Sequence, residues 1–404
     1  MIAFVLPLMA AASILLDITN LRGITRRFPD RQWPRRLYLI HFVLIDAAVA
    51  AGLLFYGKLS NAESPQAMRI ALWVIWLFFA SLAPKAVHRL FCLVDRMFFR
   101  TSGKGSTLFA KIGLVAATAT LGLLIWGATA GRTRIVVERL TLESDRLPES
   151  FDGYKIAFFT DLHTGNLPAN HRLIRRMADA IDRERPDMVV NGGDLVNIDA
   201  RELTPEVMEL LSTIRGRDGV YSVMGNHDLG FYLLENGPVT PRQNLDTLLG
   251  KQKAMGWTPL IDESVFIRRS EDSIAVTGLN FPKKGSHRGR RAELAGCDME
   301  QAYAPVPEET FDLTISHTPE FWDQALRTGN PDLTLSGHVH AMQFKIPLGC
   351  RGWSPASWKY DRWSGLYSQL EKYLFINDGM GYVMYPMRIG TPPSITVITL
   401  KKKK

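Results

Sequence analysis

Cysteine is scarce in this chain, which has three in 404 residues, at Cys92, Cys297 and Cys350. Three scattered cysteines form neither a disulfide framework nor a metal site built on thiolates, so both of those classes are excluded. A pairing of Cys297 with Cys350 stays open if the domain that carries them lies outside the cytoplasm.

Acidic residues are outnumbered by basic ones, 40 to 48, which gives a formal net charge of +8. Half of that excess comes from the four lysines at 401–404. We expect this tail to be solvated and disordered, with attraction to anionic lipid as the functional alternative. The chain also lacks internal repeats, long low-complexity segments and any nucleic-acid-binding pattern, so we expect no nucleic-acid partner.

Charged residues are rare in four apolar stretches near the start of the chain, at residues 1–16, 37–56, 70–87 and 112–130. Each stretch approaches or reaches the roughly 20 residues that a helix needs to cross a bilayer. We therefore predict an all-α transmembrane region of about four spans at 1–130, a second domain at 131–400 and a basic tail at 401–404. Core helices of a soluble bundle are the alternative interpretation.

The distribution of basic residues predicts the orientation of the spans, because loops rich in Lys and Arg are retained in the cytoplasm. Residues 22–36 contain six arginines and residues 85–104 contain five basic side chains, whereas the loop after the second span has two. Both basic segments then face the cytoplasm, which makes this a multi-pass protein of the cell membrane with an extracytoplasmic second domain. Miscounting the third or fourth span would reverse that orientation.

Two ionisable residues, His41 and Asp46, lie inside the second predicted span. Such side chains are costly in a bilayer and often functional. For Asp46 we expect a position facing the other helices, with a proton or substrate path as the alternative.

The second domain carries five short polar motifs, each at or just after the end of a predicted strand. We predict these strands at residues 154–160, 188–191, 220–224, 313–316 and 333–336, which are short apolar runs with strong β propensity. The motifs are Asp161-Leu162-His163, Gly193-Asp194, Gly225-Asn226-His227-Asp228, Ser316-His317 and Gly337-His338-Val339-His340. Strand ends hold side chains rigidly, which suits the ligands of a metal site.

These motifs supply carboxylates, imidazoles and an amide but no thiolate, a set that suits a hard or borderline divalent ion such as Mn, Fe, Zn or Ni. Two ions about 3.5–4 Å apart need a carboxylate between them, because a shared anion offsets their repulsion. Asp194 is the predicted bridge. A lone buried histidine is more often an ordinary core residue, but five ordered blocks at strand ends favour a metal centre.

In this order the motifs resemble the calcineurin-like metallophosphoesterase family, whose pattern is D-x-H, G-D, G-N-H-[D/E], H and G-H-x-H. The resemblance covers residues 154–400 and implies two ligand sets that share one carboxylate. The first metal would be bound by Asp161, His163, Asp194 and His340. The second would be bound by Asp194, Asn226, His317 and His338. The resemblance also implies that His227 contacts the phosphoryl group and serves the leaving oxygen, with Asp228 orienting its ring.

The resemblance implies an α/β fold of four layers, a β-sandwich of two mixed sheets flanked by helices. It also implies metal-assisted hydrolysis by in-line attack on phosphorus, without a covalent phosphoenzyme. Residues 336–343, 375–381 and 388–393 resemble a membrane-associated bacterial branch, in which Gly-Gly-Gln often follows the second histidine of G-H-x-H. Ala341 and Met342 replace those glycines here, which affects the pocket and the substrate rather than the metals.

Helical stretches at 171–184, 205–214, 242–255 and 319–328 alternate with the strands, as in a layered α/β domain. A basic stretch is one candidate for substrate specificity, although a solvated loop is the favoured interpretation. It contains Lys283, Lys284, His287, Arg288, Arg290 and Arg291. The aromatic stretch at 353–367 is the other candidate, and for it we favour core packing over a pocket or a membrane interface. The resemblance further suggests that Arg388 lies near the site.

We therefore predict a membrane-anchored phosphoesterase that depends on two divalent metal ions and hydrolyses a phosphomonoester, phosphodiester or pyrophosphate bond. Its partners would be the lipid bilayer and a phosphorylated substrate, either an envelope lipid or a nucleotide. One alternative faces the cytoplasm as a pyrophosphatase acting on a nucleotide-linked lipid A precursor, an activity found in the branch that the chain resembles. Another is a non-catalytic metal-binding sensor or scaffold, which the intact His227 and Asp228 argue against.

Overall fold

The computed structural model describes residues 2–27, 29–45, 65–99, 108–230, 233, 238–281, 296–348 and 352–403. Asp46, Cys350 and the predicted basic stretch from Lys283 to Arg291 lie outside these residues, as does the second half of the predicted second span. The chain divides into two compact units. One is Met1–Ala130 with Met384–Met387, and the other is Gly131–Val383 with Arg388–Lys404.

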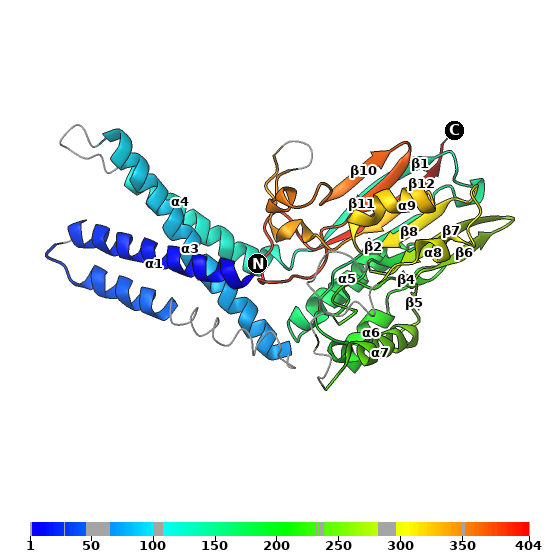
Figure 1. Ribbon diagram of the computed structural model, residues 1–404, viewed down its shortest axis with the longest axis horizontal. Coiled ribbons are helices and arrows are strands. Elements are labelled where there is room, and N and C mark those ends of the chain that lie inside the picture. The colour runs from blue at the N-terminus through cyan, green and yellow to red at the C-terminus, as the bar shows by residue number, and fades with distance from the viewer. Residues whose placement is uncertain are drawn as a thin grey trace. The chain divides into compact units, whose positions relative to one another are not determined.

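The first unit is helical (Figure 1). It contains α1 (Ile2–Arg27), a helix at residues 33–45, α3 (Pro65–Phe99) and α4 (Leu108–Trp126). Within the described residues, Met68–Phe98 and Leu108–Gly131 are long and apolar enough to cross a membrane, with mean hydropathies of 1.9 and 2.0. These two segments contain the third and fourth predicted spans.

A buried ion pair joins α1 to α3. Lys85 Nζ lies 2.7 Å from Asp17 Oδ1, and the Tyr38 hydroxyl donates a hydrogen bond to the same carboxylate at 2.6 Å. An unpaired charge among apolar helices would be costly, so the pairing favours the one arrangement of these three helices that keeps it intact.

The second unit contains two six-stranded sheets (Figure 1). The first has the strand order β1-β12-β2-β3-β4-β5, at Val136–Ser144, Ser394–Lys402, Lys155–Phe159, Met188–Asn191, Val220–Ser222 and Thr258–Pro259. The second has the order β10-β11-β9-β8-β7-β6, at Gly365–Gln369, Lys372–Ile376, Leu333–Ser336, Asp312–Ser316, Asp272–Leu279 and Glu263–Arg269. Strands β2 to β5 run parallel, and so do β7, β8, β9 and β11.

The apolar core lies between these sheets. Ile156 and Val190 from the first sheet and Ile315 and Leu335 from the second are buried in one cluster. Helices cover the outer faces: α5 (Arg172–Glu184) and α7 (Pro241–Ala254) contact the first sheet, and α6 (Pro205–Ser212) packs on α5. Two helices, α8 (Met299–Tyr303) and α9 (Trp322–Thr328), pack on the second sheet. The predicted four-layer α/β fold is confirmed.

The strand ends position the polar motifs. β3 and β9 coincide with the predicted strands, and β2, β4 and β8 differ from the predictions by at most two residues at either end. Parallel neighbours end at the same edge of a sheet, and this carboxyl edge is where α/β proteins place their sites. The loops after β2, β3 and β4 therefore emerge together, as do those after β8 and β9.

The prediction of a disordered tail is wrong for Lys401 and Lys402, which extend β12. They pair with Glu143 and Ser144 at the end of β1, and the Lys402 amide donates to Asp152 Oδ1 at 3.0 Å. Backbone pairing and nearby acidic side chains thus order a segment whose charge alone suggested disorder.

Leu335 provides a test of the core between the sheets, because its side chain is fully buried there. We expect Leu335→Ala to cost about 2–5 kcal/mol and to lower the melting midpoint of the detergent-solubilised full chain by several degrees. Leu370→Ala is the matched control, since Leu370 is 89% exposed beyond the end of β10. Equal midpoints for the two variants, measured by near-ultraviolet circular dichroism, would contradict this core.

Candidate metal centre

All nine predicted site residues lie in loops at the carboxyl edges of the two sheets. The first sheet supplies six of them, after β2, β3 and β4: Asp161, His163, Asp194, Asn226, His227 and Asp228. The second sheet supplies the other three, after β8 and β9: His317, His338 and His340. Motifs that are far apart in the sequence are brought together in space.

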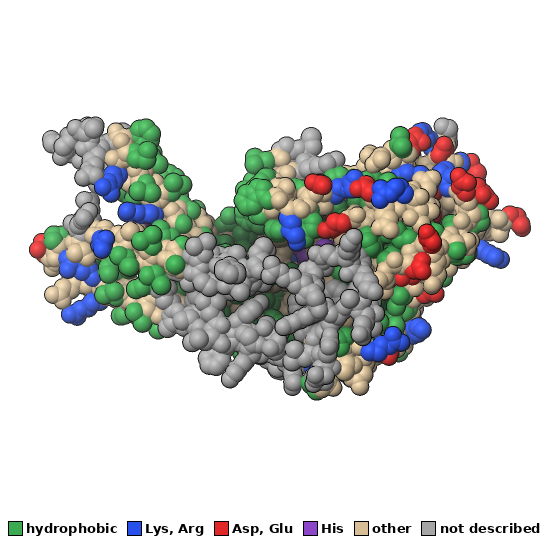
Figure 2. All heavy atoms as spheres, viewed as in Figure 1, with side chains coloured by type: hydrophobic (Ala, Val, Ile, Leu, Met, Phe, Trp, Pro, Cys, Tyr) green, Lys and Arg blue, Asp and Glu red, His purple; other side chains and the backbone are tan. Residues whose placement is uncertain are grey.

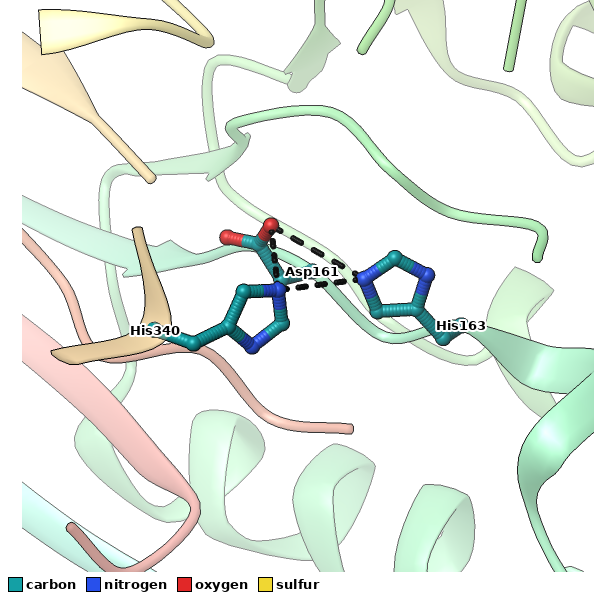
Figure 3. Close-up of side chains that lie close together, drawn as sticks. All are labelled: Asp161, His163 and His340. Atoms are coloured by element: carbon teal, nitrogen blue, oxygen red, sulfur yellow. Dashed lines mark hydrogen bonds and ion pairs between the residues drawn. The ribbon is translucent and has the colours of Figure 1, made fainter. Parts of the chain in front are cut away.

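One group consists of Asp161, His163 and His340, whose ligand atoms all lie within 4.8 Å of one another. Figure 3 shows the two rings approaching the same carboxylate oxygen from different loops. His340 Nε2 is 3.0 Å from Asp161 Oδ1 and 3.2 Å from His163 Nε2. His163 Nε2 is also 3.8 Å from Asp194 Oδ2. The four ligands predicted for the first metal therefore converge.

A second group consists of Asp194, His317 and His338, within the same limit of 4.8 Å. His317 Nε2 lies 3.2 Å from Asp194 Oδ2. His317 Nδ1 lies 2.8 Å from the Gly192 carbonyl oxygen, which can only accept, so the proton sits on Nδ1 and Nε2 faces the group. Asn226 is buried, and its Oδ1 has no hydrogen-bond partner among the residues described.

His227 forms a third group with His163 and Asp194, again within 4.8 Å, and its ring centroid lies 4.6 Å from that of His163. Its Nδ1 donates to the backbone oxygen of Asn197 at 2.6 Å, because a carbonyl can only accept. The carboxylate of Asp228 accepts from the backbone amides of Val196 at 3.1 Å and Gly225 at 3.0 Å. The orienting contact that we predicted for Asp228 is therefore made by the Asn197 carbonyl, while Asp228 ties together the loops after β3 and β4.

Five of the seven predicted ligands have a left-handed backbone, which is rare for residues other than glycine. Their φ angles are 56° at Asp161, 46° at His163, 52° at Asp194, 69° at His338 and 52° at His340. Such a conformation costs on the order of 1–3 kcal/mol per residue and persists where the surroundings over-determine it, often at functional sites.

Two motif glycines let the ligand carboxylates come close to the backbone. A Cβ atom on Gly225 would lie 2.1 Å from Asp194 Oδ1, and one on Gly337 would lie 2.2 Å from Asp161 Oδ2. Both separations are shorter than any van der Waals contact, so a larger residue at either position would displace a carboxylate. This close approach explains why glycine stands at these positions in the motifs.

Burial and charge act in opposite directions on the two carboxylates. Burial alone would raise the pKa of Asp161, but the neighbouring His340 and His317 rings outweigh it and hold that pKa below its usual value. The pKa of Asp194 is likewise held well below its usual value, because His317 and His227 outweigh burial. Both carboxylates are therefore anionic.

The imidazoles respond differently according to their neighbours. Burial lowers the pKa of His338 to about 3. Burial also opposes protonation of His317, but Asp194 beside it prevails and raises the pKa to about 10. Positive charge next to the two buried anions therefore stabilises them. In a metal-bound site, a cation would take the place of the proton on His317.

Glu202 is a buried side chain at the site that no sequence motif marks. Its carboxylate accepts hydrogen bonds from the amides of Gly165, Asn197 and Ile198 at 2.6–2.7 Å. Burial raises its pKa to about 7. The side chain joins the loop after β2 to the loop after β3, a role visible only once the loops are placed in space.

Arg388 lies at the site, as the resemblance suggested. Its side chain is buried, and Nη2 is 3.3 Å from His340 Nδ1. Nε donates to the Gly381 carbonyl at 2.6 Å, and Nη1 donates to the carbonyls of Asp378 and Thr391 at 2.9 Å. Arg388 thus holds the connection between β11 and β12 against a predicted ligand.

Two family models match this chain. The model described as calcineurin-like phosphoesterase matches residues 154–342. The model described as probable calcineurin-like phosphoesterase, transmembrane domain, matches residues 2–132. The first match lies within the unit that starts at Gly131, and the second covers residues 2–130 of the other unit and ends two residues beyond it.

Relatives with names of this kind occur in bacteria and in vertebrates. The uncharacterized metallophosphoesterase YkuE of Bacillus subtilis is 28% identical over 65% of this chain and 84% of its own length. A transmembrane protein with metallophosphoesterase domain from Danio rerio is 27% identical over 82% of this chain and 72% of its own length. The phosphodiesterase YaeI of Escherichia coli is 25% identical over 61% of this chain and 82% of its own length.

The motifs that suggested the family are gathered at one site at the carboxyl edges of two mixed sheets, and the same chain matches the family's transmembrane domain. This chain belongs to the calcineurin-like phosphoesterase family and is a membrane-associated metallophosphoesterase.

Proposed function

We propose that this enzyme binds two divalent metal ions and hydrolyses phosphate esters with them. The observation that supports this most is that one carboxylate, Asp194, lies beside a histidine of each group. Asp194 Oδ2 lies 3.8 Å from His163 Nε2 in one group and 3.2 Å from His317 Nε2 in the other. A shared anion is what two neighbouring cations require.

The ligand sets are those expected from the motifs. One ion would be held by Asp161, His163, Asp194 and His340, and the other by Asp194, Asn226, His317 and His338. Asn226 Oδ1 is a buried polar atom without a hydrogen-bond partner among the residues described, as expected of an atom that binds a cation. Donors of this kind without a thiolate fit Mn, Fe, Zn or Ni. When bound, the ions would activate water and offset the charge on the phosphoryl oxygens.

In this proposal, His227 donates a proton to the leaving oxygen. Its Nδ1 donates its proton to the Asn197 carbonyl, and in this proposal Nε2 is the atom that meets the phosphoryl group. Burial lowers the pKa of His227, so the ring is neutral in the resting site. An anionic phosphoryl group beside it would favour the protonated form, and Nε2 could then pass that proton to the leaving oxygen.

The substrate carries a phosphomonoester, phosphodiester or pyrophosphate bond, on an envelope lipid or a nucleotide. The name of the Escherichia coli relative, a phosphodiesterase, favours a diester. A non-catalytic sensor is not favoured, because a binding site has no need of a proton donor such as His227 beside it. The catalytic domain comprises residues 131–400, and the membrane region of about four spans comprises residues 1–130.

The catalytic domain faces away from the cytoplasm in this proposal. The basic segments at 22–36 and 85–104 support that orientation, since both would be retained inside. This distinguishes the enzyme from a cytoplasm-facing pyrophosphatase acting on a nucleotide-linked lipid precursor, which is not favoured.

The shared carboxylate predicts the metal content. We expect elemental analysis of the metal-loaded wild type to give two divalent ions per chain and Asp194→Asn to lose both or retain one weakly, with nearly all activity lost. Asp246→Asn is the control, because that carboxylate is largely exposed on α7 and lies outside the site. A wild type that saturates at one ion per chain would rule out the binuclear proposal.

The assigned roles predict different phenotypes for two histidines. His227→Ala should keep both metals but lower kcat by about 10²–10⁴-fold, the usual contribution of a proton-transfer residue. His338→Ala should lose metal and activity together. Metal content and turnover are measured on the same samples, and equal loss of metal from both variants would show that His227 is a ligand.

Sidedness is tested by thiol labelling of intact cells. Cys92, Cys297 and Cys350 are first replaced by serine, and single cysteines are then introduced as Leu370→Cys in the catalytic domain or Arg31→Cys between the first two helices. Both positions are exposed. An impermeant maleimide should label position 370 in intact cells and position 31 only after permeabilisation. The reverse pattern would place the catalytic domain in the cytoplasm.

A further inference from the structure

The aromatic stretch that we expected to pack in the core does so only in part. Trp363 and Tyr367 are buried, as predicted. Trp358, however, is 78% exposed, and its ring packs edge to face against that of Trp353 with centroids 5.4 Å apart. Trp353 is half-buried, so the exposed Trp358 is the side chain that requires another explanation than the core. We call the described residues 344–348 and 352–363 the aromatic lobe.

The outer surface of the aromatic lobe is apolar. Leu348 is 62% exposed and Ile346 is also exposed. Ile346 and Trp353 are paired by two backbone hydrogen bonds of 2.8 Å, which hold the two sides of the lobe together. Figure 2 shows hydrophobic side chains gathered over the part of the second unit that Figure 1 draws in orange.

Basic residues accompany these apolar side chains. Of the three basic residues in the lobe, Lys345 lies 3.8 Å from Asp378 Oδ2 and Arg362 is paired with Asp323 at 2.9 Å. Lys359 is exposed next to Trp358, with its Nζ 4.5 Å from the centroid of the Tyr360 ring. Tryptophan and leucine beside lysine is the composition of protein surfaces that bind the interface of an anionic bilayer.

The base of the aromatic lobe rests on the loop that carries two predicted ligands. Ala356 and Trp363 are buried against Val339 and Ala341, the residues next to His338 and His340 in sequence. The Tyr360 ring centroid is 6.4 Å from that of His338. Whatever the outer surface binds is therefore held close to the metal centre.

A bilayer fits this surface better than a protein partner does. A specific protein interface buries at least about 1,000 Å² in total, which is more than a few exposed side chains provide. A membrane surface requires no matching shape, and the chain is itself membrane-associated, so a bilayer is always within reach.

We propose that the aromatic lobe docks the catalytic domain on a bilayer that contains anionic lipid, and so presents lipid-borne phosphate to the metal centre. The docking stands independently of the proposed function, whereas the choice of a lipid substrate rests on it. Insertion of Leu348 and Trp358 into the interface would supply the apolar part of the binding energy, and Lys359 would supply the electrostatic part.

Docking is tested on the full chain reconstituted into vesicles of phosphatidylcholine and phosphatidylglycerol. A cysteine-free background carries Leu348→Cys labelled with an environment-sensitive fluorophore, and the matched control carries Leu370→Cys at the far end of β10 from the lobe. We expect brominated lipid to quench the label at position 348 and not at position 370. Absence of quenching at position 348 would overturn the proposal, because the label would then be surrounded by water, the chain's own helices or a second copy. Equal quenching at both positions would overturn it as well.

The substrate class is tested with the double variant Leu348→Ser, Trp358→Ser. Hydrolysis of soluble bis-p-nitrophenyl phosphate should be unchanged, while hydrolysis of phosphatidylglycerol, a diester already present in the vesicles, should fall by roughly tenfold or more because two buried apolar anchors are lost. An equal loss on both substrates, no loss on phosphatidylglycerol, or a wild type active on the soluble diester alone would contradict delivery of lipid-borne phosphate. A wild type inactive on both substrates would count against the proposed function, and the quenching result would still decide the docking.

Discussion

Asp194 is a buried carboxylate whose Oδ2 lies 3.8 Å from His163 Nε2 and 3.2 Å from His317 Nε2, one histidine from each sheet. The organisation of the site follows from the cost of burying this negative charge. Asp194 is 2% exposed, and the nearby carboxylate of Asp161 is fully buried as well. Two buried anions are costly unless positive charge is brought to them. The surrounding imidazoles supply part of it, since Asp194 raises the pKa of His317 even though burial opposes protonation. Two cations sharing this carboxylate would supply the rest.

The backbone contributes to the geometry of the site as much as the side chains do. Ligands sit on loops at the carboxyl edges of two facing sheets, and several of them occupy strained left-handed conformations. That strain has to be balanced by contacts that fix the loops. Glu202 binds the amides of two loops, Asp228 binds the amides of Val196 and Gly225, and the Asn197 carbonyl orients His227. Sites held in this way stay close to their productive geometry.

Most features that depend on residues close together in the sequence could be predicted from the sequence. The strands at 188–191 and 333–336 were predicted to the residue, because each is a short apolar run that ends in a polar motif. The motif residues converge as expected, because the order of the five motifs is typical of one fold. The contacts of Glu202 and the Asn197 carbonyl escaped notice, because one involves a single glutamate with no motif and the other a backbone atom. Lys402 and Trp358 were misjudged for a related reason: pairing with β1 and exposure on the surface depend on neighbours distant in sequence.

The central claim is that Asp194 lies between two metal ions, and magnetic coupling reports on that arrangement directly. Two Mn²⁺ ions bridged by one carboxylate and about 3.5–4 Å apart are close enough for their spins to couple. Electron paramagnetic resonance of the manganese-loaded wild type should therefore show the broad multiline spectrum of an exchange-coupled pair. A six-line spectrum of isolated Mn²⁺ at full metal loading would contradict the account.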